Sequence, residues 1–157
     1  MANVRSDDGI LCHHIAFGSK AGASTIFLTR HATTHSLIEP EDSIGSETTT
    51  VVTVSAFVER HGIPQIDLLK IDAEGSDLDV PRGAQKLLAV GRIRFVLAEV
   101  GFSPGDHRHV LFDEVRSFLT PFGFRLFRIY DQQVEWSGPR FIRFANVCFC
   151  HGSVFGL

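Results

Sequence analysis

Two acidic residues, Asp72 and Glu74, directly follow an apolar run and precede Gly75. Carboxylates in this position can accept a proton from a substrate or hold a polar group of a ligand. The run itself, IDLLKI at 66–71, is apolar on both faces of a pleat, which predicts a central strand of a parallel sheet with helices on either side. Open α/β sheets bind ligands at the carboxyl ends of such strands, which predicts a site here. The alternative is that the two acids only begin a loop and cap the next helix.

A second buried strand with the same ending is predicted at 94–100, which reads RFVLAEV. Its acid, Glu99, is followed by Gly101. The carboxyl ends of neighbouring parallel strands meet at one edge of a sheet, so we expect Glu99 to line the same crevice as Asp72 and Glu74.

A helix is predicted between these two strands. Ser76 and Asp79 resemble a capping box, and Asp77 suits the positive end of a helix dipole. Pro81 would remove a hydrogen bond inside a helix that starts at Ser76. The helix is therefore either kinked, in which case Pro81→Leu should stabilise the chain, or it begins at Pro81.

The remaining pattern completes an α/β sandwich. Helices are predicted from Thr53 or Ser55 to His61 and over 111–119, and strands at 124–130 and 144–150 form an antiparallel hairpin at one edge. Strands alternating with helices and ending in a hairpin indicate a mostly parallel sheet with an antiparallel carboxyl-terminal strand.

The amino-terminal third is predicted to contain a hairpin and a lid. Residues 10–17 and 25–29 are apolar enough for two strands, and the GSKAG segment at 18–22 suits a turn between them. Residues 30–50 are polar and show no periodicity, which favours a long loop that could cover a site.

Composition indicates one soluble globular domain, because 157 residues with 44% hydrophobic and 21% charged side chains can bury a core. The net charge of −3 gives no field that would attract nucleic acid, and no apolar run approaches the roughly 20 residues of a membrane span. Three cysteines and a polar amino terminus argue against a secreted disulfide framework, so we expect a cytoplasmic protein.

A metal site is not predicted. No pair of histidines has a ligand spacing such as HExxH, and scattered loop histidines are usually solvated; those considered are His13, His14, His31, His35, His107 and His109. Cys148 and Cys150 beside His151 would need a second ligand pair, so both cysteines are interpreted as small buried apolar residues.

The stretch DLLKIDAEG, residues 67–75, carries a more specific pattern. It is followed by an acidic helix start at Asp77 and Asp79, an Arg-Gly-Ala turn at 82–84 and a strand that ends in Glu99, and an Ala-Xaa-Gly turn precedes it at 16–18. In these features the chain resembles the FkbM family of S-adenosylmethionine-dependent methyltransferases. The likeness covers most of the chain, although Pro81 stands where the family usually has leucine.

The resemblance implies a class I, Rossmann-like methyltransferase fold that uses S-adenosylmethionine to methylate a hydroxyl of a small metabolite or sugar. Asp72 would lie beside the methionine end of the cofactor, and Asp72 or Glu74 could accept the proton of the hydroxyl. Ile15 and Ala16 match the region that meets the adenine, unless they are only an ordinary buried strand end.

One part of the family pattern is missing: no glycine-rich cluster precedes Ile10. Residues 1–157 therefore look like a single, N-terminally truncated domain, which should bind the cofactor weakly and self-associate through an exposed edge of the 66–71 strand. The alternative function is a catalytically silent fragment or pseudoenzyme. A weaker alternative, with Asp72 and Glu74 as magnesium ligands of a phosphotransfer domain, lacks a P-loop.

Overall fold

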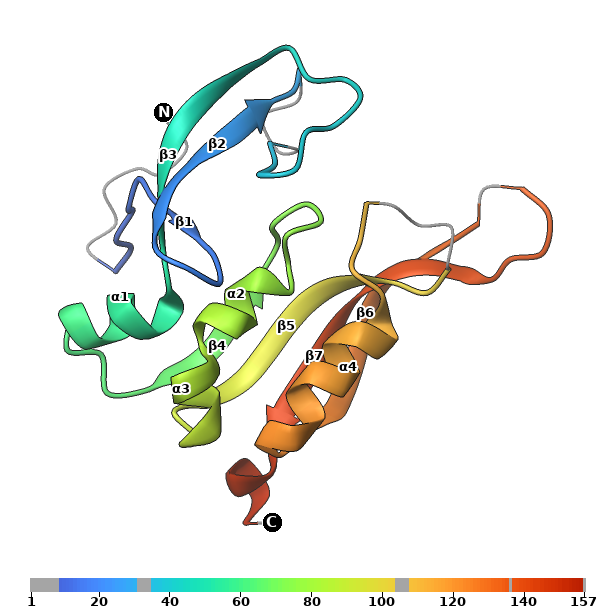
Figure 1. Ribbon diagram of the computed structural model, residues 1–157. Helices are drawn as coiled ribbons and strands as arrows, with labels where there is room; N and C mark the ends of the chain where they lie inside the picture. The colour runs from blue at the N-terminus through green and yellow to red at the C-terminus, as the bar shows by residue number, and fades with distance from the viewer. Residues whose placement is uncertain (1–8, 31–34, 104–107, 136, 157) are drawn as a thin grey trace.

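The computed structural model describes residues 9–30, 35–103, 108–135 and 137–156, which form an α/β structure with two mixed sheets (Figure 1). The elements are β1 (Ala16–Phe17), β2 (Gly22–Leu28), β3 (Gly45–Val52), α1 (Val54–Arg60), β4 (Ile66–Ile71), α2 (Asp79–Gly83), α3 (Gln85–Ala89), β5 (Ile93–Gly101), α4 (Phe112–Leu119), η1 (Thr120–Phe122), β6 (Phe124–Val134), β7 (Ile142–His151) and η2 (Gly152–Phe155).

The larger sheet has four strands in the order β4-β5-β7-β6. β4 and β5 are parallel, whereas β7 runs antiparallel to both β5 and β6. The predicted terminal hairpin is confirmed, but the prediction of a mostly parallel sheet is wrong. The reason is that β7 inserts between β5 and β6 and pairs antiparallel with both, which leaves β4 and β5 as the single parallel pair, at one edge of this sheet.

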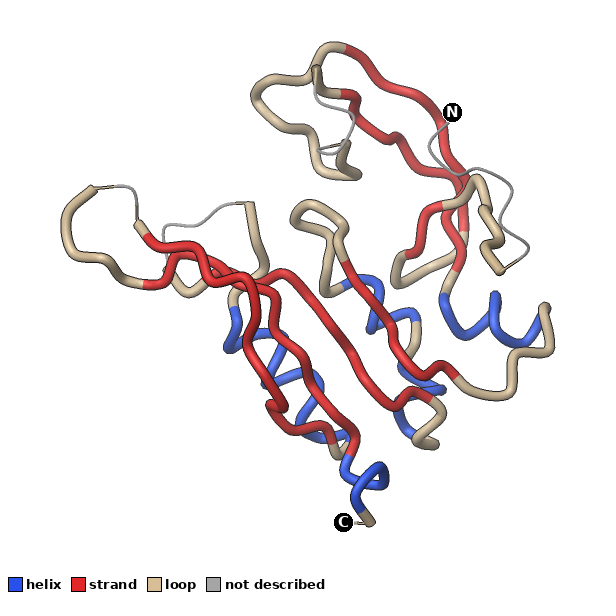
Figure 2. The backbone as a smooth tube through the Cα atoms, turned by 180° about the vertical axis from the view of Figure 1, so that it is seen from behind, coloured by secondary structure: helices blue, strands red, loops and turns tan. Residues whose placement is uncertain are grey.

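β4 is an edge strand, which corrects the prediction of a central strand. Its described neighbour is β5 alone, and α2, α3 and α4 all lie on one face of the sheet, so that the strands are uncovered when seen from behind (Figures 1 and 2). Leu69 and Ile71 pack toward the core, while Leu68, which alternates with them, is 53% exposed. An apolar run alone does not distinguish a strand covered on both faces from one covered on a single face.

The core lies between this sheet and its helices. On β5, Val96, Ala98 and Val100 are almost completely buried, and they alternate with partly exposed residues. Together with apolar side chains from the helices and from β4, β6 and β7 they form one continuous cluster, and burial of such surface is the main stabilising contribution to the fold. Cys148 and Cys150 are buried on β7, as predicted, and are not in a disulfide.

The helix boundaries follow from capping and from proline. The Thr53 hydroxyl accepts a hydrogen bond from the backbone N–H of Ala56 at 3.1 Å, so α1 begins where it was predicted. α2 begins at Asp79 rather than at Ser76 or Pro81. Pro81 is its third residue, where a backbone N–H would have no partner within the helix, so the proline does not cost a hydrogen bond.

The smaller sheet has three strands in the order β1-β3-β2, with β1 parallel and β2 antiparallel to β3. The predicted hairpin between 10–17 and 25–29 is wrong, because both strands pair with β3 instead of with each other. β3 occupies part of the segment that was predicted to be a lid, of which residues 31–34 lie outside the described ranges. β3 was not predicted because its residues are mostly polar and exposed, so the sequence shows no alternation of apolar and polar residues there. Its threonines are β-branched, and such residues favour strands.

The smaller sheet approaches α2, one of the helices that cover the larger sheet, at two glycines. A Cβ atom on Gly83 of α2 would collide with the carbonyl oxygen of Gly18, and one on Gly18 would lie 2.8 Å from Val51 of β3. The Ala-Xaa-Gly turn and the Arg-Gly-Ala turn, which are far apart in the sequence, therefore meet in space. The described residues include no helix that combines the length and the apolar character required to cross a membrane.

Candidate active site

The turn after β4 is held by a buried carboxylate. Asp77, which is 4% exposed, accepts hydrogen bonds from the backbone N–H groups of Ala73 at 2.9 Å and Gly75 at 3.0 Å. Glu74 and Gly75 have positive φ angles of 45° and 93°, which glycine adopts easily and glutamate does not. Asp77 thus stabilises the turn that presents Asp72 and Glu74. From the sequence, Asp77 was expected at the start of a helix, and its role in holding this turn was not predicted.

Each of the three predicted acids has a basic partner. Asp72 pairs with Lys70 at 3.0 Å, Glu74 with Arg108 at 3.5 Å, and Glu99 with His109 at 3.3 Å. The Asp72 side chain is 59% exposed, whereas those of Glu74 and Glu99 are 21% and 25% exposed.

These acids are close enough to influence one another. Burial raises the pKa of Glu99, and the charges of Asp72 and Glu74 raise it further, while His109 and Lys70 act in the opposite direction. The structure therefore brings together the carboxylates that follow β4 and end β5. Their role in catalysis stays a prediction.

The environment of His109 differs from the one predicted from the sequence. Its side chain is 12% exposed, and its ring stacks on Phe144 with centroids 4.5 Å apart and an angle of 18° between the planes. The prediction that the loop histidines are solvated is wrong for this one. Its place in the loop after β5, a strand that ends in an acid, was a signal that it could lie near Glu99.

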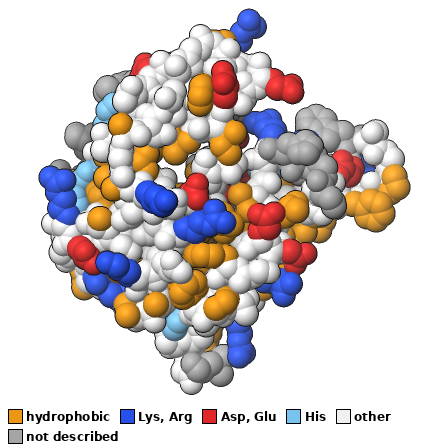
Figure 3. Space-filling model, in the orientation of Figure 1, with side chains coloured by type: hydrophobic (Ala, Val, Ile, Leu, Met, Phe, Trp, Pro, Cys, Tyr) orange, Lys and Arg blue, Asp and Glu red, His pale blue; other side chains and the backbone are white. Residues whose placement is uncertain are grey.

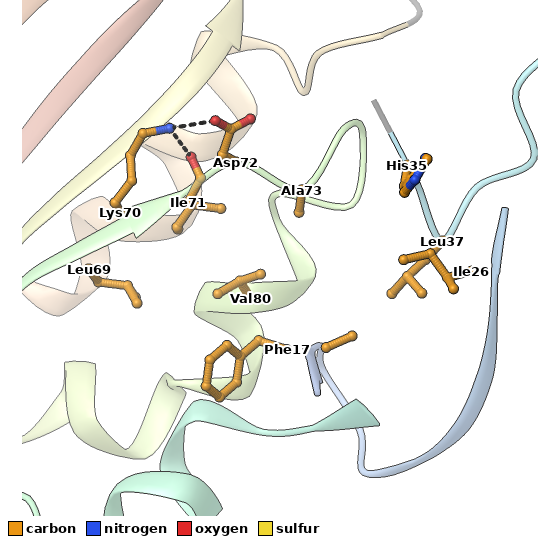
Figure 4. Close-up of a pocket in the computed structure, with 11 residues that line it drawn as sticks. Phe17, Ile26, His35, Leu37, Leu69, Lys70, Ile71, Asp72, Ala73 and Val80 are labelled. Atoms are coloured by element: carbon orange, nitrogen blue, oxygen red, sulfur yellow. Dashed lines mark hydrogen bonds and ion pairs between the residues drawn. The ribbon is translucent and has the colours of Figure 1, made fainter. Parts of the chain in front are cut away.

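A cavity of about 280 Å³ lies beside the acidic turn, between β4, α2 and the smaller sheet (Figure 4). Its lining residues are Ala16, Phe17, Ile26, His35, Leu37, Leu69, Lys70, Ile71, Asp72, Ala73 and Val80. Leu69, Val80 and Phe17 lie on one side of the cavity, opposite Leu37 and Ile26 (Figure 4). The Asp72 carboxylate is turned toward Lys70. Ala16 and Asp72 thus line the same cavity. Ile15, Glu74 and Glu99 are not among the described residues that line it.

The smaller sheet is tied to the acidic turn by one side chain of the segment that was predicted to be a lid. The Ser36 hydroxyl donates a hydrogen bond to the carbonyl oxygen of Glu74 at 2.8 Å, and Ser36 also forms an isolated bridge with Phe27 of β2. His35 and Leu37, on either side of it, line the cavity. This segment therefore forms a wall of the cavity at the point where β4 ends.

The lining combines an apolar wall with a carboxylate beside an ammonium. An apolar wall can contact a ring or alkyl part of a ligand, and the charged pair can bind polar groups. The volume is slightly below the range of about 300 to 1,000 Å³ that is typical of small-molecule sites. Within the described residues, no three side chains of His, Cys, Asp or Glu are grouped so that they could bind a metal ion.

The face that carries this region is mixed in charge. In the space-filling view, basic and acidic side chains stand next to each other between apolar patches, without one sign dominating (Figure 3). Short-range pairs such as Lys70 with Asp72 account for this pattern within the site.

Comparison with known proteins gives one finding. The model of the methyltransferase FkbM domain matches residues 3–126, which include the three-stranded sheet, the acidic turn and β5. No curated protein and no solved structure matches the chain. Since the match covers most of the sequence and includes Asp72, Glu74 and Glu99, this chain belongs to the FkbM methyltransferase family.

Proposed function

We propose that the chain is a cytoplasmic, S-adenosylmethionine-dependent methyltransferase that acts on a hydroxyl oxygen of a small metabolite or sugar, within a partial class I, Rossmann-like fold. The main support for the proposal is that Ala16 and Asp72 line the same cavity in a chain of the FkbM family. Glu74 and Glu99 do not line that cavity, but the charges of Asp72 and Glu74 act on Glu99, so an acceptor could be placed near these acids.

S-adenosylmethionine, when bound, supplies a methyl group on a positively charged sulfur. The protein then has to hold the acceptor oxygen in line with that methyl group and receive the proton of the hydroxyl. Ala16 and Phe17 would contact the apolar end of the cofactor, and Asp72, oriented by Lys70, would bind its amino group. The neighbouring acids supply proton acceptors.

A second candidate, a catalytically silent module, is favoured by two observations. The cavity is small for a complete cofactor, and β4 has a paired neighbour on one side only among the described residues. An unpaired strand edge can pair with another chain, so self-association through β4 belongs to this proposal as well.

Cofactor binding can be tested by NMR titration of the protein with S-adenosylmethionine up to millimolar concentration, with light scattering to measure its mass. Because the cavity is small, we expect binding weaker than micromolar, with shifts that begin at Ala16, Phe17 and Asp72. The absence of any shift would favour the silent module. Micromolar binding by a monodisperse monomer would contradict both weak binding and self-association.

The role of Asp72 can be tested with a matched pair of variants. Asp72→Asn removes the charge at the cavity, whereas Asp67→Asn makes the same change at the other end of β4, where the side chain is 76% exposed and pairs with Arg94. We expect Asp72→Asn to weaken the cofactor shifts and methyl transfer and Asp67→Asn to leave both unchanged. Equal behaviour of the two variants would remove Asp72 from the site.

A further inference from the structure

The three ion pairs at the strand ends differ in the chemistry of their bases. The partners of Asp72 and Glu74 are a lysine and an arginine, side-chain types that ordinarily carry a positive charge throughout the neutral pH range. The partner of Glu99 is a histidine, the side chain whose charge ordinarily changes near neutral pH. Among the three acids, Glu99 is thus the one whose partner belongs to a residue type that can gain or lose its charge near neutral pH.

Glu99 is also the carboxylate best suited to receive a proton. Burial raises its pKa, and Asp72 and Glu74 raise it further. A general base is most effective when its pKa approaches the working pH, so a raised value makes a carboxylate a better proton acceptor than an ordinary exposed one.

His109 is held in a fixed orientation beside Glu99. Its ring stacks on Phe144, and the guanidinium of Arg143 lies 5.7 Å from the centre of the same phenyl ring. The imidazole Nε2 atom lies 3.3 Å from one carboxylate oxygen of Glu99, so it can hold that oxygen. The charged groups around the pair are Lys70, Asp72, Glu74, Arg108 and Arg143.

We propose that Glu99 is the catalytic proton acceptor and that His109 is its positioning residue, for an acceptor that carries an alcohol hydroxyl. This inference rests on the proposed function. Asp72 lines the cavity, and its charge also acts on Glu99. A cofactor in the cavity would therefore leave the space beside Glu99 for the acceptor.

The proposed step balances without a further reactant. The acceptor oxygen forms a bond to the methyl carbon while the carbon–sulfur bond breaks and its electron pair remains on sulfur. The hydroxyl proton passes to a carboxylate oxygen of Glu99, and His109 remains next to the other oxygen throughout.

The pair can be tested first in the protein without cofactor, by NMR of the His109 imidazole. In the Glu99→Gln variant the ring signals of His109 should move, because the carboxylate beside Nε2 is replaced by an amide. Glu114→Gln, an exposed glutamate on α4, is the control and should leave these signals unchanged. Unmoved ring signals of His109 in Glu99→Gln would overturn the pairing.

Catalysis is tested by the pH profile of methyl transfer. Loss of a general base should reduce transfer by a factor of about 10² to 10⁴ in Glu99→Gln, with cofactor shifts at Ala16 retained. His109→Gln, which keeps a side-chain N–H donor, should move the acidic limb of the profile to higher pH, because the histidine charge that lowers the pKa of Glu99 is gone.

Two results separate this inference from the proposed function. Transfer by Glu99→Gln at a rate close to that of the wild type, or an unmoved limb in His109→Gln, would overturn the roles of Glu99 and His109 alone. A wild-type protein with neither cofactor shifts nor transfer would overturn the proposed function, and the inference with it.

Discussion

The two sheets of this protein differ in what supports them. The four-stranded sheet rests on α2, α3 and α4 and supplies much of the continuous apolar core. In the three-stranded sheet, Val51 alone among the described apolar side chains is buried, and most of β3 is exposed. The larger sheet therefore carries most of the stability, whereas the smaller one contributes mainly a wall of the cavity through Ala16, Phe17 and Ile26.

This difference explains why the cavity lies at the junction of the two sheets. Asp72 follows a strand of the sheet that contains most of the buried core, and the smaller sheet, with few buried side chains, closes the space from the other side. Elements with few buried contacts open more readily than core elements, which is an advantage where a ligand must enter.

The largest expected effect tests the core of the larger sheet. Val96→Ala on β5 should lower the free energy of unfolding by about 2 to 4 kcal/mol, because this fully buried side chain would leave a cavity. Val51→Ala, the same change in the smaller sheet, should cost at most about 2 kcal/mol, because Val51 is not part of the continuous core. Urea denaturation measures both. An equal loss for the two variants would contradict the proposed division of stability.

The next effect concerns the contact between the sheets. Gly83→Ala should cost about 1 to 3 kcal/mol, because the new methyl group collides with the backbone at Gly18. Amide hydrogen exchange should show faster opening of β2 and β3 than of β5. Gly22→Ala, where a Cβ would meet no atom within 4 Å, is the control. Unchanged exchange in Gly83→Ala would show that this contact does not hold the sheets together.

The link from β3 into α1 depends on one cap. Thr53→Ala removes the acceptor for the N–H of Ala56 and should lower stability by about 1 kcal/mol. Thr48→Ala, on exposed β3, should stay within about 0.5 kcal/mol of the wild type. Thermal unfolding compares the two variants, and an identical midpoint for both would mean that the cap does not stabilise α1.

A smaller effect is expected at Pro81, where the sequence pattern and the structure lead to different predictions. From the sequence alone, Pro81→Leu was one way to gain stability. In the structure Pro81 is buried in the first turn of α2, so leucine restores no helix hydrogen bond and has to fit a packed site. We expect stability to fall by up to about 1 kcal/mol in urea denaturation. A clear gain would indicate that α2 extends toward Ser76 in solution.

The smallest effect is a pH dependence that distinguishes Glu99 from an exposed acid. Its folded-state pKa is raised above the ordinary value of 4.5, mainly by burial. The contribution of Glu99 to the free energy of unfolding is therefore fully present at pH values below 4.5, and it is lost as pH rises through the folded-state pKa. Relative to Glu99→Gln, the wild type should lose stability over this interval, whereas Glu114→Gln should follow the wild type. A parallel course of Glu99→Gln and wild type would contradict a raised pKa.

Local patterns in the sequence determined several elements of this protein. The cap at Thr53, the apolar face of α4 and the runs that form β4 and β5 were predicted correctly, because capping and periodicity act within a few residues. The acidic pattern from Asp72 to Asp77 also indicated the family, since the order of its residue types is specific.

Pairing between distant segments was decided only by the tertiary structure. β3 lies in the middle of the smaller sheet although its residues are mostly polar, and β4 is an edge strand although its residues are apolar. His109 and Glu99 meet because the chain at Val110 and Leu111 lies beside Gly101 at the end of β5, and Gly18, after β1, meets Gly83 on α2. Strand order and loop placement depend on which apolar faces the whole chain can bury at once, and no local stretch of sequence contains that information.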